Sequence, residues 1–255
     1  MTKSVLLDLA GVVYQGEAAI PGAIEAIARL RDAGLGVRFL TNTTRTPKGV
    51  LVQRLQAMGF DIAPDEVYTP AKAACDWLNA HKLAPHLLVH EDLKPEFSGC
   101  GGDAGEAVIV GDAGHDFTYE ALNAAFRSLI GGAEFLALAR NRTFKDIDDE
   151  LSLDAGAFVA ALEYATQRQA HVLGKPSPEF FHLALETLSC PPEEAVMVGD
   201  DAESDVAGAL AAGIGAGLLV RTGKYREGDE DAVEPRPTAV VDDLPAAVDW
   251  ILRPR

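Results

Sequence analysis

The sequence has no apolar run long enough to cross a membrane. A transmembrane helix needs about 20 consecutive apolar residues, and charged or polar residues interrupt every apolar stretch of this 255-residue chain much sooner. The apolar stretch at residues 5–9 is broken by Asp8, so it also lacks the core of a secretory signal peptide. We therefore expect no membrane partner and a cytoplasmic location.

Cysteine is scarce as well. Cys75, Cys100 and Cys190 are odd in number and widely spaced, and none belongs to a C-x-x-C pair. This pattern argues against a zinc site or a dithiol redox site. Because cytosolic cysteines are usually reduced, the sequence predicts three free thiols without an assigned role.

Positive charge is in deficit. The chain has 22 Lys and Arg against 39 Asp and Glu, a formal net charge of −17. Such a chain repels polyanions, so we expect no nucleic-acid partner. The glycine-rich residues 98–105 lack the Lys-Ser/Thr of a P-loop and are predicted to be a surface loop.

Short apolar runs alternate with helical patterns along the chain. Apolar runs typical of buried strands occur in both terminal regions, at residues 5–9, 37–40, 195–199, 217–220 and 239–241. Helical patterns begin near Pro21, Thr46 and Asp205, and the last extends to Ala212. This alternation predicts right-handed crossovers and a Rossmann-like parallel sheet, an α/β fold to which both ends of the chain contribute.

The middle of the chain alternates in the same way. Strand-like runs at 87–89, 107–110 and 135–138 accompany helical patterns at 119–130 and 156–167. These residues predict a second, smaller α/β layer. The acidic residues Asp146, Asp148, Asp149 and Glu150 lack the spacing of an EF-hand and are predicted to lie in a solvated loop.

Four segments place polar residues at or near the carboxyl ends of predicted strands. They are Asp8, Thr41 with Asn42, Lys175, and Asp200 with Asp201 and Asp205. Ligands of open parallel sheets bind beyond the carboxyl ends of the strands, so these groups are expected to meet there. Several carboxylates, an ammonium and a hydroxyl suit a pocket for Mg²⁺ and a phosphoryl group.

Each of these motifs is weak by itself. A carboxylate after a strand is often a helix cap or a turn former, and Gly-Asp-Asp can be only a turn. Their order along the chain and their shared position after strands favour the joint interpretation. The sequence as a whole resembles the haloacid dehalogenase superfamily, whose four motifs match residues 8–13, 40–42, 174–178 and 199–205 in order.

The long insertion between the second and third motifs is similar to the α/β cap of the NagD-like branch of that superfamily, and residues 116–119 with Leu122 match a cap signature there. The resemblance implies a core domain of residues 1–76 and 173–255 and a cap domain of residues 77–172. It also implies that the cap selects the substrate and can support a homodimer. Asp112, His115 and Asp116 are the cap candidates for substrate selection.

The resemblance also implies roles in the core. Asp8 is the expected nucleophile, which forms an aspartyl-phosphate, while Thr41, Asn42 and Lys175 bind the phosphoryl group. Asp8, the Ala10 carbonyl and Asp200 are the expected Mg²⁺ ligands, with Asp201 and Asp205 in support. The implied substrate is a phosphorylated small molecule or a phosphoprotein.

Ala10 departs from the superfamily pattern, in which a second Asp at this position acts as general acid and base. Acid–base catalysis typically contributes about 10²–10⁴ in rate. We therefore expect substrates whose leaving group departs unaided: phosphohistidine or phospholysine, pyrophosphate, or an aryl phosphate. The alternatives are a catalytically impaired binding or regulatory protein and a metal-independent haloacid dehalogenase, which Gly199-Asp200-Asp201 and the cap disfavour.

Overall fold

The computed structural model describes residues 2–145 and 150–253 and divides the chain into two compact units. The core unit comprises Met1–Thr41, Lys48–Tyr68 and Lys175–Arg255, and the inserted unit comprises Asn42–Pro47 and Thr69–Gly174. The inserted unit thus begins before the boundary expected at residue 77, because one continuous helix, Pro70–His81, cannot be divided there. Asp146, Asp148 and Asp149 lie outside the described residues.

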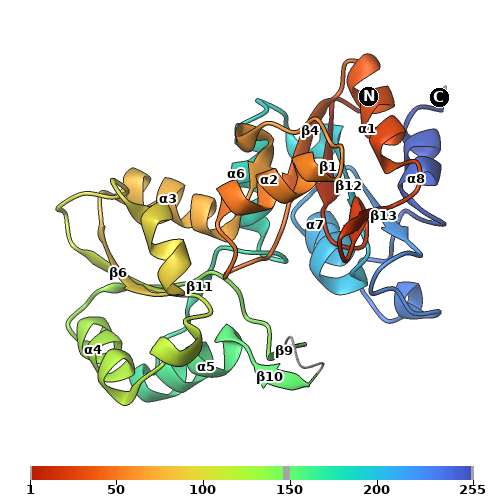
Figure 1. Cartoon of the computed structure of the whole chain (residues 1–255). Coiled ribbons are helices and arrows are strands. Elements are labelled where there is room, and N and C mark those ends of the chain that lie inside the picture. Colours follow the sequence, from red (N-terminus) through yellow and green to blue (C-terminus); the bar gives the residue numbers. More distant parts are fainter. Residues whose placement is uncertain (1, 146–149, 254–255) are drawn as a thin grey trace. The chain divides into compact units, whose positions relative to one another are not determined.

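The core unit contains a six-stranded parallel sheet in the order β14-β13-β12-β1-β4-β5 (Figure 1). Its strands are β1 (Ser4–Asp8), β4 (Gly36–Leu40), β5 (Val67–Tyr68), β12 (Ala195–Gly199), β13 (Ala216–Val220) and β14 (Ala239–Val241). Every residue of β1, β12 and β13 is buried, as their continuous apolar runs predict. The predicted parallel α/β fold is confirmed.

Helices pack on this sheet. They are α1 (Ala23–Asp32), α2 (Lys48–Ala57), α6 (Pro178–Glu186), α7 (Gly208–Ala211) and α8 (Leu244–Ile251). The buried stripe of α1, Ala23, Ala26, Ile27 and Leu30, shares one apolar cluster with alternate residues of the strands and with α8, and Figure 1 shows α1 and α8 side by side. A short hairpin, β2 (Tyr14–Gln15) with β3 (Ala18–Ala19), follows β1.

The helix expected over 205–212 begins earlier and with a different geometry. Residues Ala202–Ala207 form a π-helical segment, η5, which continues into α7. Asp201 caps η5, because its carboxylate accepts a hydrogen bond from the Ser204 N–H at 2.9 Å. Three-residue 3₁₀ turns, η1 (Pro64–Glu66), η4 (Pro192–Glu194) and η6 (Asp229–Asp231), complete the core unit.

The inserted unit has its own four-stranded parallel sheet, in the order β11-β8-β7-β6. The strands are β6 (Ala84–Leu88), β7 (Glu106–Val110), β8 (Glu134–Ala137) and β11 (His171–Val172). Three helices accompany them: α3 (Pro70–His81), α4 (Tyr119–Ile130) and α5 (Ala155–Thr166), capped by Thr69, Thr118 and Asp154. The turns η2 (Glu91–Phe97) and η3 (Gly114–Asp116) and an antiparallel pair, β9 (Thr143–Lys145) with β10 (Leu151–Leu153), complete it.

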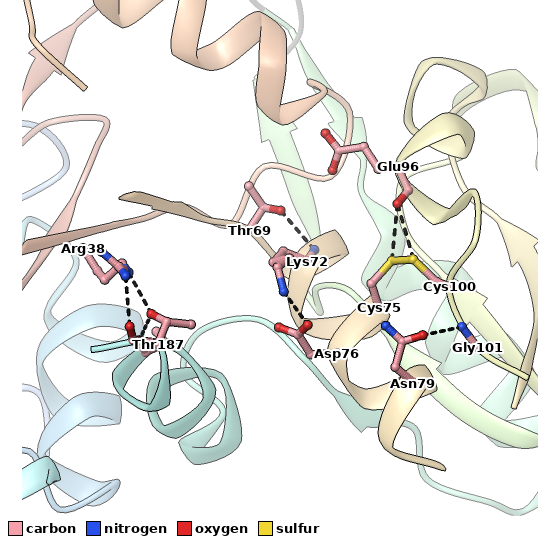
Figure 2. Close-up of polar contacts among 11 residues, drawn as sticks. Arg38, Thr69, Lys72, Cys75, Asp76, Asn79, Glu96, Cys100, Gly101 and Thr187 are labelled. Carbon is pink, nitrogen blue, oxygen red and sulfur yellow. Dashed lines mark hydrogen bonds and ion pairs between the residues drawn. A yellow bond between two sulfur atoms is a disulfide. The ribbon is translucent and has the colours of Figure 1, made fainter. Parts of the chain in front are cut away.

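The expectation of three free thiols is wrong for two of them. Cys75 on α3 and Cys100 form a disulfide, with Cα atoms 5.3 Å apart (Figure 2). Cys190 is free and buried. Packing of η2 against α3 brings the two cysteines together, and a separation of 25 residues in sequence cannot reveal such a contact. Nearby, the Asn79 amide oxygen accepts a hydrogen bond from the Gly101 N–H at 2.6 Å.

Among the helices that the structure describes, none combines the length and the apolar character needed to cross a bilayer.

Candidate active site

Asp8 lies at the carboxyl end of β1, in the centre of the core sheet. β1 pairs with β12 on one side and β4 on the other, so the chain leaves all three strands at the same edge. Asp200 directly follows β12, and Thr41 directly follows β4. Asp8 and Asp200 are 7% and 2% exposed, respectively. The topology therefore places two buried carboxylates side by side where ligands of parallel sheets bind.

Lys175 joins the carboxylates of this edge. Its ammonium donates a hydrogen bond to Asp8 Oδ1 and forms an ion pair with Asp205 Oδ1 at 2.6 Å. Both Lys175 and Asp205 are buried. A charge in the interior is stable only when it is paired, and the two carboxylates supply that pairing.

Asp8, Asp200 and Asp205 form a group suited to a hard cation. One carboxylate oxygen from each lies within 4.8 Å of the others. The Lys175 ammonium pairs with Asp8 and Asp205, and Asp200 is buried beside them, so three buried carboxylates lie around one buried ammonium. Oxygen donors of this kind are the ligands that Mg²⁺ prefers, so the residues fit a divalent magnesium ion.

Two glycines make room for Asp200. A Cβ atom on Gly11 would lie 2.1 Å from Asp200 Oδ2, and one on Gly223 would lie 2.0 Å from the same oxygen. Both glycines have positive φ, at +90° and +66°. The Lys224 N–H donates to Asp200 Oδ2 at 2.8 Å, and the Thr222 hydroxyl donates to the Gly11 carbonyl. The backbone of Gly11, Gly223 and Lys224 thus lies directly against the Asp200 carboxylate.

Gly199 leaves space for the Asp205 side chain in the same way. A Cβ atom on Gly199 would lie 2.2 Å from the Asp205 Cβ, so only glycine lets η5 approach the end of β12 this closely. The Asp201 N–H donates to Asp205 Oδ2 at 3.2 Å and fixes the carboxylate. π-helical segments occur frequently at functional sites, and here one presents Asp205 to Lys175.

Burial changes the acidity of these groups. Burial raises the pKa of Asp8 to about 7, with Asp205 and Asp200 adding repulsion and Lys175 opposing it. Burial and the Asp205 charge raise the pKa of Asp200 to about 6. Burial alone would lower the pKa of Lys175, but Asp205 and Asp8 outweigh it and raise the pKa, so Lys175 stays cationic.

The remaining core residues predicted for the site are Asp201, Ala10, Thr41 and Asn42. Asp201, expected in support of the metal, caps η5 and pairs with Lys224 at 3.3 Å, and it is not among the three grouped carboxylates. Ala10 is exposed and forms a β-bridge with Tyr14. Thr41 belongs to the core unit and Asn42 to the inserted unit, and both are half-buried.

The inserted unit holds the three predicted selectivity residues. Asp112 is buried and forms an ion pair with Arg45, whose guanidinium lies 4.6 Å from the centre of the Phe144 ring. His115 and Asp116 are exposed on η3. His115 and Asp116 therefore lie at the surface of this unit, whereas Asp112 is buried in an ion pair within it.

Sequence patterns missed the groups that position the carboxylates. Gly11 lies within the motif at residues 8–13, but neither its spacing nor that of Thr222 and Gly223 indicates contact with Asp200, which only the proximity of distant backbone segments reveals. Arg45 was missed as well, because an arginine in a polar loop carries no signal of its own. The alternation of strand and turn located the carboxylates but not what surrounds them.

Two family models match parts of this chain. Residues 5–102 match the family described as haloacid dehalogenase-like hydrolase, and residues 172–247 match the HAD-hydrolase-like family. A zebrafish (Danio rerio) protein named phospholysine phosphohistidine inorganic pyrophosphate phosphatase is 48% identical over 99% of this chain and 95% of its own length. Human haloacid dehalogenase-like hydrolase domain-containing protein 2 is 45% identical over 98% of this chain and 96% of its own.

Solved structures share the fold over nearly the whole chain. NagD from Escherichia coli K-12 is 27% identical with a TM-score of 0.86, covering 96% of this chain and 98% of its own. The 4-nitrophenylphosphatase of Thermotoga maritima is 27% identical with a TM-score of 0.87, covering 97% of each chain. A Mycobacterium tuberculosis glycerol phosphate phosphatase in complex with magnesium is 27% identical, with a TM-score of 0.83, covering 96% of this chain and 76% of its own.

A parallel α/β core with an inserted unit and a buried Asp–Lys–Asp cluster defines a hydrolase of the haloacid dehalogenase type. The chain belongs to the haloacid dehalogenase-like hydrolase family, and its enzyme class is that of a phosphatase of this family. The resemblance to the NagD-like branch is confirmed.

Proposed function

We propose that the chain is a magnesium-dependent phosphohydrolase that forms an aspartyl-phosphate on Asp8. The observation that carries the proposal is the ion-paired cluster of Asp8, Lys175 and Asp205 beside Asp200, buried at the carboxyl edge of the sheet. Such a cluster is costly to bury unless it binds something of opposite charge. A divalent cation together with a phosphoryl group meets this requirement.

Asp8 acts as the nucleophile in the proposed reaction. Its carboxylate oxygen attacks phosphorus, the bond from phosphorus to the leaving group breaks, and the leaving group takes the electron pair. Water then attacks the acyl phosphate, which releases phosphate and restores Asp8. Lys175 stays cationic and faces Asp8, so it can neutralise phosphoryl oxygens, and Mg²⁺ held by Asp8, Ala10 and Asp200 would supply further positive charge.

Ala10 points to the substrate class. It offers no side-chain proton to a departing alkoxide, so a substrate with a good leaving group is favoured. Phosphohistidine, phospholysine, pyrophosphate and aryl phosphates all satisfy this condition, and the zebrafish relative is named for the first three. In this proposal the inserted unit is a cap that selects the substrate, with Asp112, His115 and Asp116 as candidates and Thr41 and Asn42 as phosphoryl ligands.

The first test is phosphate release from p-nitrophenyl phosphate, pyrophosphate and a phosphohistidine mimic, with Mg²⁺ and with chelator. We expect Mg²⁺-dependent release that disappears in Asp8→Asn, while Asp249→Asn, which alters an exposed residue of α8, keeps most of the activity. Phosphate release that persists in Asp8→Asn would contradict the covalent route.

A catalytically impaired binding protein is the second candidate, and Ala10 is the observation in its favour. It predicts magnesium binding by calorimetry without release of phosphate from any of the three substrates. A metal-independent dehalogenase would instead release halide from a haloacid in the presence of chelator, and a halide assay separates it from both.

A further inference from the structure

The core unit contains a cavity apart from the Asp8 cluster. It has a volume of about 420 Å³, within the range of small-molecule sites, and lies where the β2–β3 hairpin faces α2. None of Asp8, Lys175, Asp200 and Asp205 lines it. The hydrolase chemistry therefore leaves this cavity without a role.

The floor of the cavity is apolar. Leu51 and Leu55 on α2 are buried, and Met58 is half-buried at the end of that helix. Tyr14 contributes an aromatic wall from β2. A surface of this composition favours an aliphatic or aromatic body over a fully polar one.

Two opposite charges stand on the walls of the same cavity. Arg54 comes from α2 and Glu17 from the turn between β2 and β3, and both are exposed. Within the part of the chain that the structure describes, neither side chain makes a hydrogen bond or an ion pair, with the other or with any further group. The lining thus offers one cationic and one anionic group beside the apolar residues, which suits a ligand that carries both an anionic and a cationic group.

We propose that this cavity binds a small zwitterion with an apolar body, namely an apolar α-amino acid. Arg54 receives the carboxylate, Glu17 receives the ammonium, and the side chain packs on Leu51, Leu55 and Met58. The two charged groups of the ligand, both attached to its α-carbon, then match Arg54 and Glu17, and its side chain matches the apolar lining.

The cavity also has a route to the catalytic loop. The Gly11 N–H donates to the Tyr14 carbonyl at 2.7 Å, and Ala10 forms a β-bridge with Tyr14. A ligand packed on Tyr14 therefore contacts the residue that holds the backbone next to Asp8. The bound amino acid is expected to change the rate of phosphate release, which makes the cavity an effector site.

The test is a titration of the full-length ¹⁵N-labelled protein with L-leucine, followed by NMR. We expect saturable shifts of the Tyr14, Gly16 and Leu55 amides. Glycine, which lacks the apolar body, leucinamide, which lacks the carboxylate, and N-acetyl-leucine, which lacks the ammonium, should each bind about tenfold more weakly or worse, because one charged hydrogen bond or the apolar contact is lost.

Matched variants assign each end of the ligand. Arg54→Gln should abolish the preference for leucine over leucinamide, and Glu17→Gln should abolish the preference over N-acetyl-leucine. Arg29→Gln, a substitution of an exposed arginine on α1, and Asp8→Asn should leave binding unchanged. Absence of saturable shifts, or preferences that survive both variants, would overturn the site. Binding without any change in kcat or KM for phosphate release would overturn the effector role.

Discussion

At the scale of single residues, charge is the dominant feature of the core unit. Asp8, Asp200 and Asp205 are buried close together, and the Lys175 ammonium pairs with Asp8 and Asp205. An acid whose pKa is raised by folding binds its proton more tightly in the folded state. Its ionisation therefore lowers the free energy of unfolding as pH increases.

We expect the metal-free protein to lose stability as the pH rises from about 4 to about 7. The pKa values of Asp8 and Asp200 rise from 3.8 to about 7 and about 6, so the unfolded chain releases these protons first across that window. Asp200→Asn should make the metal-free protein more stable at pH 8 by about 1–3 kcal/mol. Urea unfolding in chelator at pH 4.5 and pH 8 measures both effects.

Mg²⁺ provides the control for this prediction. Saturating metal should restore stability to the wild type at pH 8 and not to Asp200→Asn, since binding to the folded state alone stabilises it. Equal stability of the two metal-free proteins at pH 8 would contradict the account of repulsion.

Gly223→Ala should weaken magnesium binding by about 10–100-fold, because the added Cβ displaces Asp200. Gly213→Ala is the matched control, since Gly213 also has positive φ, at +85°, but a Cβ there meets no atom within 4 Å. Both variants bear the same backbone strain of about 1 kcal/mol. Isothermal titration with Mg²⁺ separates them, and equal affinities in the two variants would contradict the role of the glycine pair.

Ala10→Asp should raise the turnover of an alkyl phosphate relative to a phosphoramidate, by about tenfold or more, because the new carboxylic acid can protonate an alkoxide. The ratio of kcat/KM for glycerol phosphate and for phosphoramidate is the measurement. Ala10→Ser tests whether a hydroxyl alone suffices. An unchanged ratio in Ala10→Asp would mean that Ala10 does not determine the leaving group.

At the scale of secondary-structure elements, the disulfide joins α3 to the loop after η2 within the inserted unit. Closing a loop of 25 residues stabilises a fold by about 2–4 kcal/mol. We expect a reductant to lower the urea midpoint of the wild type and to leave the Cys75→Ser/Cys100→Ser variant unaffected. Cys190→Ser should respond to reductant as the wild type does, and a reductant-insensitive wild type would contradict the prediction.

The elements differ in how well sequence predicts them. The pattern predicted α4 over residues 119–130 and β14 over residues 239–241, because each has a clear period or a clear apolar run. It missed η5, since one residue inserted per turn leaves little trace in a helical spacing. It also missed the β2–β3 and β9–β10 pairs, whose strands are two or three residues long.

The residues of the candidate site also differ in whether the sequence predicts them. Asp8 and Asp200 were predictable because parallel strands end at one edge, and Lys175 and Asp205 because they belong to motifs of the superfamily that the sequence resembles. The glycines around Asp200, the cap formed by Asp201 and the Cys75–Cys100 bond depend on contacts between distant segments. Spacing along the chain carries no information about such contacts.

At the scale of the whole molecule, most of the large exposed apolar side chains belong to the inserted unit. Leu151 and Leu153 on β10 are 74% and 62% exposed, and Tyr164 on α5 is 83% exposed. Leu151 and Leu153 alternate along the strand and so share a face. Apolar groups gathered in this way favour association, which fits the predicted homodimer through the cap.

Leu153→Asp should convert the dimer to a monomer, because it places a charge in an apolar interface. Size-exclusion chromatography with light scattering is the measurement. Val50→Asp, a substitution at a residue of the core unit that is 40% exposed, should leave the dimer intact. A wild type that is monomeric at 100 µM, or a dimer that survives Leu153→Asp, would contradict this prediction.

The order of strands in the core sheet has a consequence for how the chain is made. β1 lies between β12 and β4, so one of its two neighbours is synthesised only after the inserted unit. At about 5–20 residues per second, a ribosome needs roughly 10–40 s to travel from Asp8 to β12. Throughout that interval the nascent β1 has an open edge, while residues 69–174 can already fold. The candidate active site is therefore among the last parts of the newly synthesised protein to form.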